Sequence, residues 1–448
     1  MFPPVLIWKI IHPIRCRLNK WHRGVAGILG DLKKTEYLSR DELCHLQETK
    51  LRLLCESAAA GSPYFRDILA ETGLEPQQIS LESLSTLPFL DKETIRNHFH
   101  HLVNHNYPSE QIFLNATGGS SGEPLEFYRT YHDMVFAHAT THRGIAWCGM
   151  KPGDSHVKLW GAPTDVQSAT AGLKAKLWSR IYNQRIINAF DAGPDLFEKE
   201  YANFRKRPPF LLESYSSILY EFACYLDRTN KPPLHIPAVI SSAGVLYDFQ
   251  RESIQKMISG NVFNRYGSRE FGNVAQECSC HSGLHINMER YIVEIVNADE
   301  NGVGDILVTD LENHAFPFIR YRIGDKGIFS NQACPCGRET LMIDKIAGRE
   351  LDIIRTTSGR LIAGEVFPHF FKDYPQILLG QVVQDRLDHI EIRLKLQADA
   401  KVGDLDPLIR KIVNISKNEL TVTVNTKQDL IVNPTGKYRP VISQLEIQ

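Results

Sequence analysis

The sequence predicts an α/β protein with a large N-terminal domain and a small C-terminal α+β domain. A chain of 448 residues is longer than one hydrophobic core usually supports. Segments with strand composition alternate with a helical run between residues 157 and 266, which is typical of α/β layers. After residue 343 the pattern changes to short strands with two helical runs. We therefore divide the chain into domains at residues 1–347 and 348–448.

Most of the first 100 residues are predicted to be helical, because leucines recur in a charged background. Pro88 ends this pattern, and Asp91 is expected to cap a following helix. Further helices are expected at Tyr131–Trp147, Ser217–Asp227, Glu365–Asp373 and Pro407–Glu419. Strands are expected at Val157–Trp160, Phe210–Ser214, Ala238–Ser242, Val262–Tyr266, Tyr291–Val296, Gly304–Thr309, Gly327–Ser330, Arg349–Ile354, Gly359–Ile362, Ile377–Gln384 and His389–Leu396.

Composition excludes some classes of function. Hydrophobic residues make up 43% and charged residues 23%, as in ordinary soluble proteins. Lys and Arg number 51 against 52 Asp and Glu, so no basic excess points to a nucleic-acid partner. No segment approaches the roughly 20 apolar residues that span a bilayer. A cytoplasmic protein is expected.

The N-terminal segment Met1–Gly24 begins apolar and continues basic, the reverse of a secretory signal peptide. Two interpretations remain. An amphipathic helix at the membrane surface would give peripheral contact with the inner face of the membrane. A first helix docked on the protein's own core is favoured.

The segment Leu114–Phe127 contains the strongest signal, a run of glycines and hydroxyl residues ending in Pro124. Glycines let the backbone approach a ligand, and successive N–H groups suit a polyanion such as a triphosphate. The spacing is not that of a Walker loop. A polar turn between two strands is the alternative.

Three further segments carry candidate chemistry. Asn264–Glu270 follows a strand and offers an aromatic ring with a carboxylate that could bind Mg²⁺. A strand ending in Gly324-Asp325 would present one carboxylate at its tip, suited to two vicinal hydroxyls. Lys437 stands in a Pro/Gly turn near the C-terminus. Each segment can also be explained without a ligand, as a turn, a salt bridge or a solvated lysine.

Two close cysteine pairs, Cys278/Cys280 and Cys334/Cys336, suggest metal ligation rather than a disulfide framework. Together with nearby histidines they offer enough ligands for tetrahedral zinc. Reduced cysteines without a metal are the alternative.

In combination, these segments resemble the adenylate-forming (acyl-CoA synthetase) superfamily, most closely its phenylacetate–CoA ligase/CapK-like branch. The motifs follow the family's order over about residues 80–440. The matching segments are Thr117–Pro124, Ser241–Val245, Tyr266–Glu270, Arg320–Asp325, the hinge Gly348–Asp352 and Gly436-Lys437.

The resemblance implies a role for each matched residue. Thr117, Ser120 and Ser121, with Gly118, Gly119 and Gly122, would hold the β- and γ-phosphates of ATP. Ala243 and Gly244 would lie along the adenine, and Tyr266, followed by Gly267 and Ser268, would line the nucleotide or acyl pocket. Glu270 would bind Mg²⁺, Asp325 the ribose hydroxyls, and Lys437 would neutralise charge during adenylation. Arg349 would lie at the hinge before a mobile lid domain.

The same resemblance selects the zinc ligands. Branch members carry Glu-Cys…Gly-Leu-His and Cys-x-Cys-Gly, matched here by Cys278, His285, Cys334 and Cys336. A Cys₃His site is therefore preferred, with Cys₄ through Cys280 as the alternative. Such a structural site would pin the Ala275–Asn287 loop to the Asn331–Arg338 loop.

Some positions depart from the family pattern. Glu123 replaces a lysine common in the phosphate loop, and Arg269 replaces the usual Thr before Glu270. Lys345 and Leu351 depart from the usual residues around the hinge. These changes leave the adenylation half better supported than the second half-reaction.

The resemblance implies an ATP- and Mg²⁺-dependent enzyme that adenylates a carboxylic acid and passes the acyl group to coenzyme A. Alternatives are transfer to an amine of a sugar or to a carrier protein, as in capsule or exopolysaccharide synthesis, and a non-catalytic nucleotide-binding protein. Relatives of this kind are often homodimers. The sequence does not identify the acid.

Overall fold

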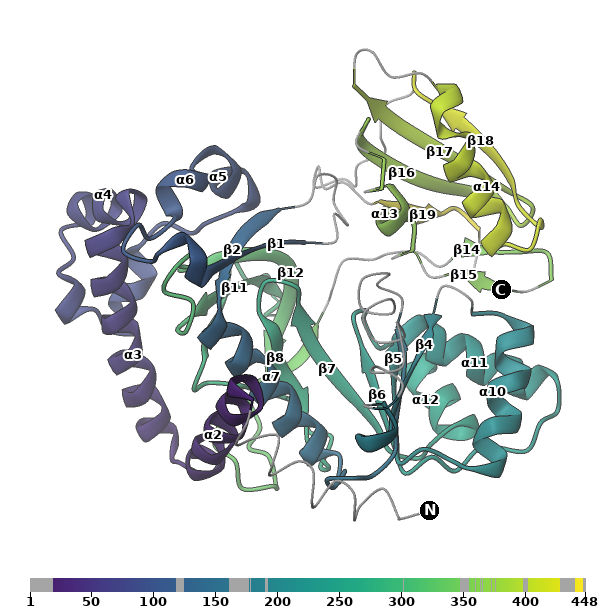
Figure 1. The fold of residues 1–448 in the computed structure, drawn as a ribbon, viewed down its shortest axis with the longest axis horizontal. Coiled ribbons are helices and arrows are strands. Elements are labelled where there is room, and N and C mark those ends of the chain that lie inside the picture. Colours follow the sequence, from purple (N-terminus) through teal and green to yellow (C-terminus); the bar gives the residue numbers. More distant parts are fainter. Residues whose placement is uncertain are drawn as a thin grey trace.

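An 11-stranded mixed sheet forms the centre of the protein, in the order β10-β11-β12-β13-β9-β8-β7-β6-β5-β3-β4 (Figure 1). Its parallel half contains β3 (His156–Trp160), β4 (Gln184–Asn188), β5 (Leu211–Tyr215), β6 (Ala238–Ser242) and β7 (Val262–Ser268). Its antiparallel half contains β8 (Gly272–Glu277), β9 (Leu284–Ile286), β10 (Tyr291–Val296), β11 (Gly304–Asp310), β12 (Tyr321–Phe329) and β13 (Met342–Ile346). Pairing changes direction at β7, which is parallel to β6 and antiparallel to β8.

The computed structural model describes most of the chain. The described residues are 19–117, 125–160, 177, 179–189, 192–300, 302–346, 354–358, 360–362, 364, 366–371, 373–374, 376–397, 402–427 and 440–445. The segment 1–18, on which the interpretation of the N-terminus as a membrane-surface helix depends, lies outside them. None of the described helices has the length and apolar character needed to cross a bilayer.

Helices cover both halves of the sheet. Helices α10 (Pro194–Lys206), α11 (Ser216–Arg228) and α12 (Asp248–Met257) pack on the parallel half through aromatic residues such as Phe197 and Phe222. The N-terminal helices α3 (Arg40–Gly61) and α4 (Pro63–Thr72) share a second core with the antiparallel half. Helix α7 (Tyr131–Trp147) lies across the change of direction, with Ile145 against β5, β6 and β7.

Helix α2 (Lys20–Thr35) packs on α7 through Val25, Leu32, Val135 and Phe136. Asn19 caps its first turn, because its side chain accepts hydrogen bonds from two backbone N–H groups. The first described helix is therefore docked on the protein's own core. Short helices α5 (Lys92–Asn97) and α6 (Phe99–Leu102) lead to the hairpin of β1 (Ile112–Ala116) and β2 (Glu126–Thr130).

A separate four-stranded sheet follows near the C-terminus, in the order β18-β17-β16-β19. It consists of β16 (Ile377–Arg386), β17 (His389–Leu396), β18 (Thr421–Asn425) and β19 (Val441–Ser443), with α13 (Val366–Phe371) and α14 (Asp406–Ile415). These elements share their own hydrophobic core and lie above α11 in Figure 1. The hairpin of β14 (Ile354–Arg355) and β15 (Leu361–Ile362) contacts α11. The boundary at residues 347 and 348 stays a prediction.

The α/β fold class is confirmed, and most predicted elements lie within a few residues of their expected bounds. Helix α7 and strands β6, β10 and β17 have the predicted bounds. Asp91 caps α5 as expected, with its carboxylate accepting from the Thr94 backbone N–H at 2.8 Å. Prediction missed β8, whose polar residues resemble a loop. Gln276 is nevertheless buried in β8 and donates to the Gly144 carbonyl of α7 at 2.7 Å.

Glu312 forms ion pairs with a residue of α3 and a residue of α7. These pairs lead to an expected pH dependence of the free energy of unfolding. The Glu312 carboxylate, about 10% exposed, pairs with Lys50 and lies 2.8 Å from His132 Nε2. Burial would raise its pKa, but the hydrogen bonds and charges of His132 and Lys50 lower it from 4.5 to about 2. The stabilisation is therefore complete above pH 4.5 and is lost as the pH falls through about 2.

Replacing Glu312→Gln is expected to lower the free energy of unfolding at pH 7 by on the order of 2 kcal/mol. The difference from wild type should shrink between about pH 4.5 and pH 2, as measured by urea unfolding across pH. Asp31→Asn, which removes an exposed pair with Lys34, is the control and should change stability little. A pH-independent difference for Glu312→Gln would contradict this prediction.

Candidate active site

A cavity of about 1850 Å³ opens at the carboxyl ends of the central parallel strands. Open α/β sheets commonly bind ligands at this edge. Helices α2 and α7 contribute one wall, including Trp21 and His138. The described residues that the sequence assigned to the nucleotide site all line this cavity: Thr117, Ala243, Gly244, Tyr266, Gly267, Ser268, Glu270 and Asp325.

The remaining residues predicted for the nucleotide site lie outside the described part of the chain. They are Gly118, Gly119, Ser120, Ser121 and Gly122 of the phosphate loop, Arg349 of the hinge and Lys437.

Thr117 closes the base of the glycine loop. Its backbone N–H donates to the Leu125 carbonyl at 2.9 Å, and its Oγ1 accepts from the Leu125 N–H at 2.9 Å. These two bonds extend the β1–β2 hairpin to Thr117 and Leu125. The Thr117 hydroxyl proton can still donate to a ligand.

Two tyrosines position the candidate carboxylates. The Tyr266 hydroxyl donates to Asp325 Oδ2 at 3.0 Å, which links β7 to β12. The Tyr321 hydroxyl donates to Oε1 of the buried Glu270 at 3.3 Å. The cavity therefore contains two carboxylates, Asp325 in β12 and Glu270 in the turn between β7 and β8, and a tyrosine hydroxyl holds each of them.

The prediction that a strand ends at Asp325 is wrong. Strand β12 continues to Phe329, and Asp325 lies within it. The pairing of β11 with β12 shifts in register between Asp305 and Leu307, and Gly324 has φ of +95°. Because glycine tolerates positive φ, this irregularity presents the carboxylate without ending the strand.

The segment after β6 has an unusual backbone. Ala243 has φ of +61°, which is rare for a residue with a Cβ. The Gly244 carbonyl accepts from Ser216 Oγ at 3.0 Å, and that hydroxyl accepts from Ser241 Oγ at 2.9 Å. The turn is thus fixed to the start of α11, as expected for a segment lining a ligand site.

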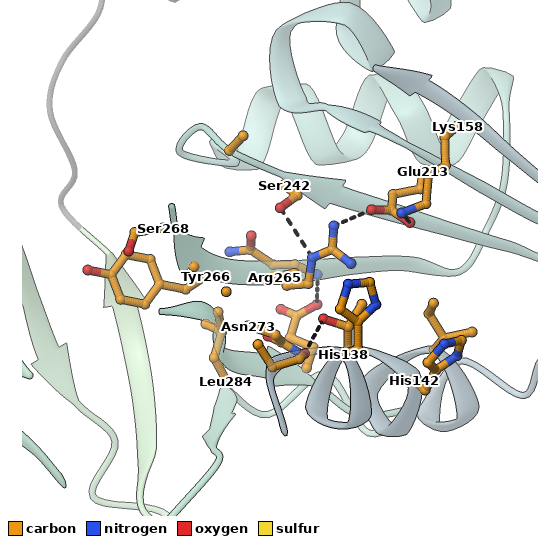
Figure 2. A pocket seen from close by; sticks show the side chains of 18 of the residues that line it. His138, His142, Lys158, Glu213, Ser242, Arg265, Tyr266, Ser268, Asn273 and Leu284 are labelled. Carbon is orange, nitrogen blue, oxygen red and sulfur yellow. Dashed lines mark hydrogen bonds and ion pairs between the residues drawn. The ribbon is translucent and has the colours of Figure 1, made fainter. Parts of the chain in front are cut away.

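Sequence analysis missed a buried ionic cluster in the same cavity, centred on Glu213 of β5. Lys158 Nζ lies 3.1 Å and His156 Nε2 lies 3.0 Å from Glu213 Oε2, and Arg265 pairs with Oε1. Arg265 Nε also donates to Ser242 Oγ at 3.2 Å. Figure 2 shows Arg265, Glu213 and Lys158 facing the side of α7 that carries His138 and His142. Only the pairing of parallel strands brings these residues together, so sequence spacing gave no signal.

The predicted zinc ligands come together near the C-terminal end of α7, where Trp147 contacts His285. The ligand atoms of Cys278, His285, Cys334 and Cys336 all lie within 4.8 Å of one another. The Cys278 and Cys334 sulfurs are 3.5 Å apart, near the roughly 3.8 Å separation of two sulfurs on tetrahedral zinc. Cys280 is exposed, so this geometry suits the Cys₃His set. Zinc itself stays a prediction.

His285 has the properties of a neutral metal ligand. Its Nδ1 lies 2.8 Å from Thr340 Oγ1, which leaves Nε2 facing Cys336 at 3.4 Å. Burial, with Arg338 and Arg143 nearby, lowers the pKa of His285 to about 4. An imidazole with a hydrogen-bonded second nitrogen is the usual form of a zinc-binding histidine.

Comparison with known proteins supports the expected relationship. No family model matches the chain. CapK of Staphylococcus aureus is 22% identical over 454 residues, covering 99% of this chain and 98% of CapK. A phenylacetate–coenzyme A ligase of Thermus thermophilus is 25% identical over 384 residues, covering 81% and 83%. The chain is a relative of the CapK and phenylacetate–CoA ligase proteins of the adenylate-forming superfamily.

Solved structures share the fold. A 2-hydroxyisobutyryl-CoA ligase in complex with 2-HIB-AMP and CoA in the thioesterification state has a TM-score of 0.60 and 19% identity, covering 92% of this chain and 91% of that chain. The same ligase in the postadenylation state has a TM-score of 0.58 and 18% identity, covering 92% of each chain.

We expect the purified protein to contain one zinc ion per chain, measured by elemental analysis. Cys334→Ser should lose the zinc and lower the melting temperature by several degrees, because metal binding contributes to folding free energy. Cys280→Ser is the matched control and should keep both. Zinc bound in full by Cys334→Ser would contradict the assignment.

Proposed function

We propose that this protein is an ATP- and Mg²⁺-dependent ligase that adenylates a carboxylic acid and transfers the acyl group to coenzyme A. The observation that carries the proposal is the single cavity lined by Thr117, the Ala243-Gly244 turn, the Tyr266–Glu270 segment and Asp325. The family's ordered motifs, distant in sequence, thus converge on one site. The names of its relatives, phenylacetate–CoA ligase and CapK, support this direction.

In this proposal, a carboxylate oxygen of the acid attacks the α-phosphate of ATP and pyrophosphate leaves. The protein contributes mainly position and electrostatics. Asp325 would accept from the ribose hydroxyls, and Thr117 would bind the phosphates with the glycine loop. Glu270, held by Tyr321, would bind the Mg²⁺ that offsets phosphate charge.

The C-terminal domain, proposed as residues 348–448, would act as a mobile lid. It would carry Lys437 for adenylation and would rotate for acyl transfer. Coenzyme A is the favoured acceptor, because the ligase with the same fold was solved with an acyl adenylate and CoA. The near full-length similarity to CapK favours a second candidate, in which an amine of a sugar or a carrier protein accepts the acyl group.

The first test is acid-dependent ATP–pyrophosphate exchange over a panel of aryl, aliphatic, hydroxy and amino acids. Wild-type protein should exchange with one acid class, and Lys437→Ala should lose about 10²-fold or more of that rate because it removes transition-state charge stabilisation. ATP binding should persist in Lys437→Ala. Equal exchange by both proteins would contradict the role of Lys437.

Asp325→Asn is expected to raise the KM for ATP by about tenfold or more, with a smaller effect on the KM for the acid, because a charged hydrogen bond to the ribose becomes neutral. Tyr266→Phe tests whether the 3.0 Å bond to Asp325 positions that carboxylate. It should produce a weaker change of the same kind. A change confined to the acid would place Asp325 in the acyl pocket instead.

A further inference from the structure

The cluster around Glu213 differs from an ordinary buried ion pair in its charge. Two cations, Arg265 and Lys158, share one carboxylate. Burial opposes ionisation of Glu213, yet Arg265 and Lys158 hold its pKa well below the ordinary value. His156 remains neutral, because burial lowers its pKa. These four residues therefore carry one net positive charge.

Among the described residues, Glu213 is the one acid that pairs with Arg265 or Lys158. His138 faces the cluster from α7, and its pKa is lowered by burial, with the charges of Lys158 and Arg129 adding to the effect. Glu277 of β8, another acid in the cavity lining, already pairs with Arg251 and His281. Arg129 is bound by Asp133 through two hydrogen bonds. A buried positive charge without a counter-charge is costly, so the cavity is suited to an anion.

Arg265 also has an unused donor. Only 8% of the residue is exposed, and its Nη1 has no hydrogen-bond acceptor among the described residues. Its Nη2 pairs with Glu213 and its Nε with Ser242, so the guanidinium is fixed in place. Arg265 and Lys158 both line the cavity, as do Glu213 and Tyr215. A guanidinium that is fixed in place and has an unpaired donor is suited to binding a carboxylate.

We propose that the acid adenylated by this protein carries a second anionic group, and that Arg265 and Lys158 bind it. The substrate class is that of dicarboxylic acids, with one carboxylate at the nucleotide and the other at Arg265. This inference rests on the proposed function, since it concerns the acyl part of the same cavity. Arg265 follows directly before Tyr266 in β7, so one strand contributes to both ends of the substrate.

The alternative is that Arg265 only neutralises Glu213 and supports the fold. Loss of Arg265 would then lower stability and affect all acids equally. Substrate selectivity distinguishes the two roles, because the loss of a purely structural residue would not change the preference between acids.

The test compares acids matched in shape: adipate with hexanoate, glutarate with pentanoate, and 4-carboxyphenylacetate with 4-methylphenylacetate. ATP–pyrophosphate exchange gives kcat/KM for each, and thermal shift measures binding of each acid separately. Wild-type protein should favour the diacid of a pair by about 10- to 100-fold, the range expected from a hydrogen bond to a charged group.

Arg265→Gln should lose this preference, because kcat/KM should fall more for the diacid than for the monoacid of each pair, and Arg265→Lys should retain part of it. Arg185→Gln is the matched control, because Arg185 pairs with Glu200 outside the cavity and should leave the preference intact. If Arg265→Gln does not fold, Lys158→Met takes its place as the variant expected to reduce the preference.

Exchange without a diacid preference, or a preference that survives Arg265→Gln, overturns the second-anion site and leaves the ligase proposal standing. A third outcome is that no acid supports exchange, while diacids raise the melting temperature of wild type and not of Arg265→Gln. This result supports the second-anion site and overturns the ligase proposal. Silence in both measurements overturns both.

Discussion

The change of pairing direction at β7 is the constraint on which the candidate site depends. On one side, β7 continues a parallel sheet whose strands end together, so the segments after β5, β6 and β7 meet at one edge. On the other side, β8 returns antiparallel, and the turn between them carries Glu270. The antiparallel half brings Asp325 of β12 to Tyr266. A purely parallel sheet would lack this second set of carboxylates.

Buried arginines show how the chain balances charge, and they clarify what is unusual about the cavity. Arg290 pairs with both Asp133 and Asp310, and Arg143 pairs with Glu289. In these structural clusters acids match or exceed cations, as burial requires. In the Glu213 cluster the ratio is reversed, because Arg265 and Lys158 pair with one carboxylate. Because of this contrast, we interpret the Arg290 and Arg143 clusters as support for the fold and the Glu213 cluster as a ligand site.

Local sequence was informative where function requires a particular backbone or residue order. The glycine loop, the Ser241–Val245 turn and the cysteine pairs each had recognisable composition. Thr117 and residues 242–245 line the cavity, and Cys278, Cys334 and Cys336 form the cysteine cluster with His285. The bulge at Asp325 and the strand β8 escaped prediction, because polar residues such as Gln276 become strand residues only when α7 accepts their hydrogen bonds. The Glu213 cluster could not be predicted, since its members come from three strands whose order appears only in the fold.

Helix α7 connects the cysteine cluster with the cavity. Its last residue, Trp147, contacts His285 with ring centroids 5.7 Å apart, and Arg338 lies 4.7 Å above the Trp147 ring. His138 faces the cavity about 14 Å away along the same helix, at about 1.5 Å per residue. A rigid helix transmits a tilt at one end to the other as a displacement that grows with distance. The cysteine cluster therefore anchors one end of a helix that lines the cavity, and a change in the cluster that tilts α7 would change the width of the cavity.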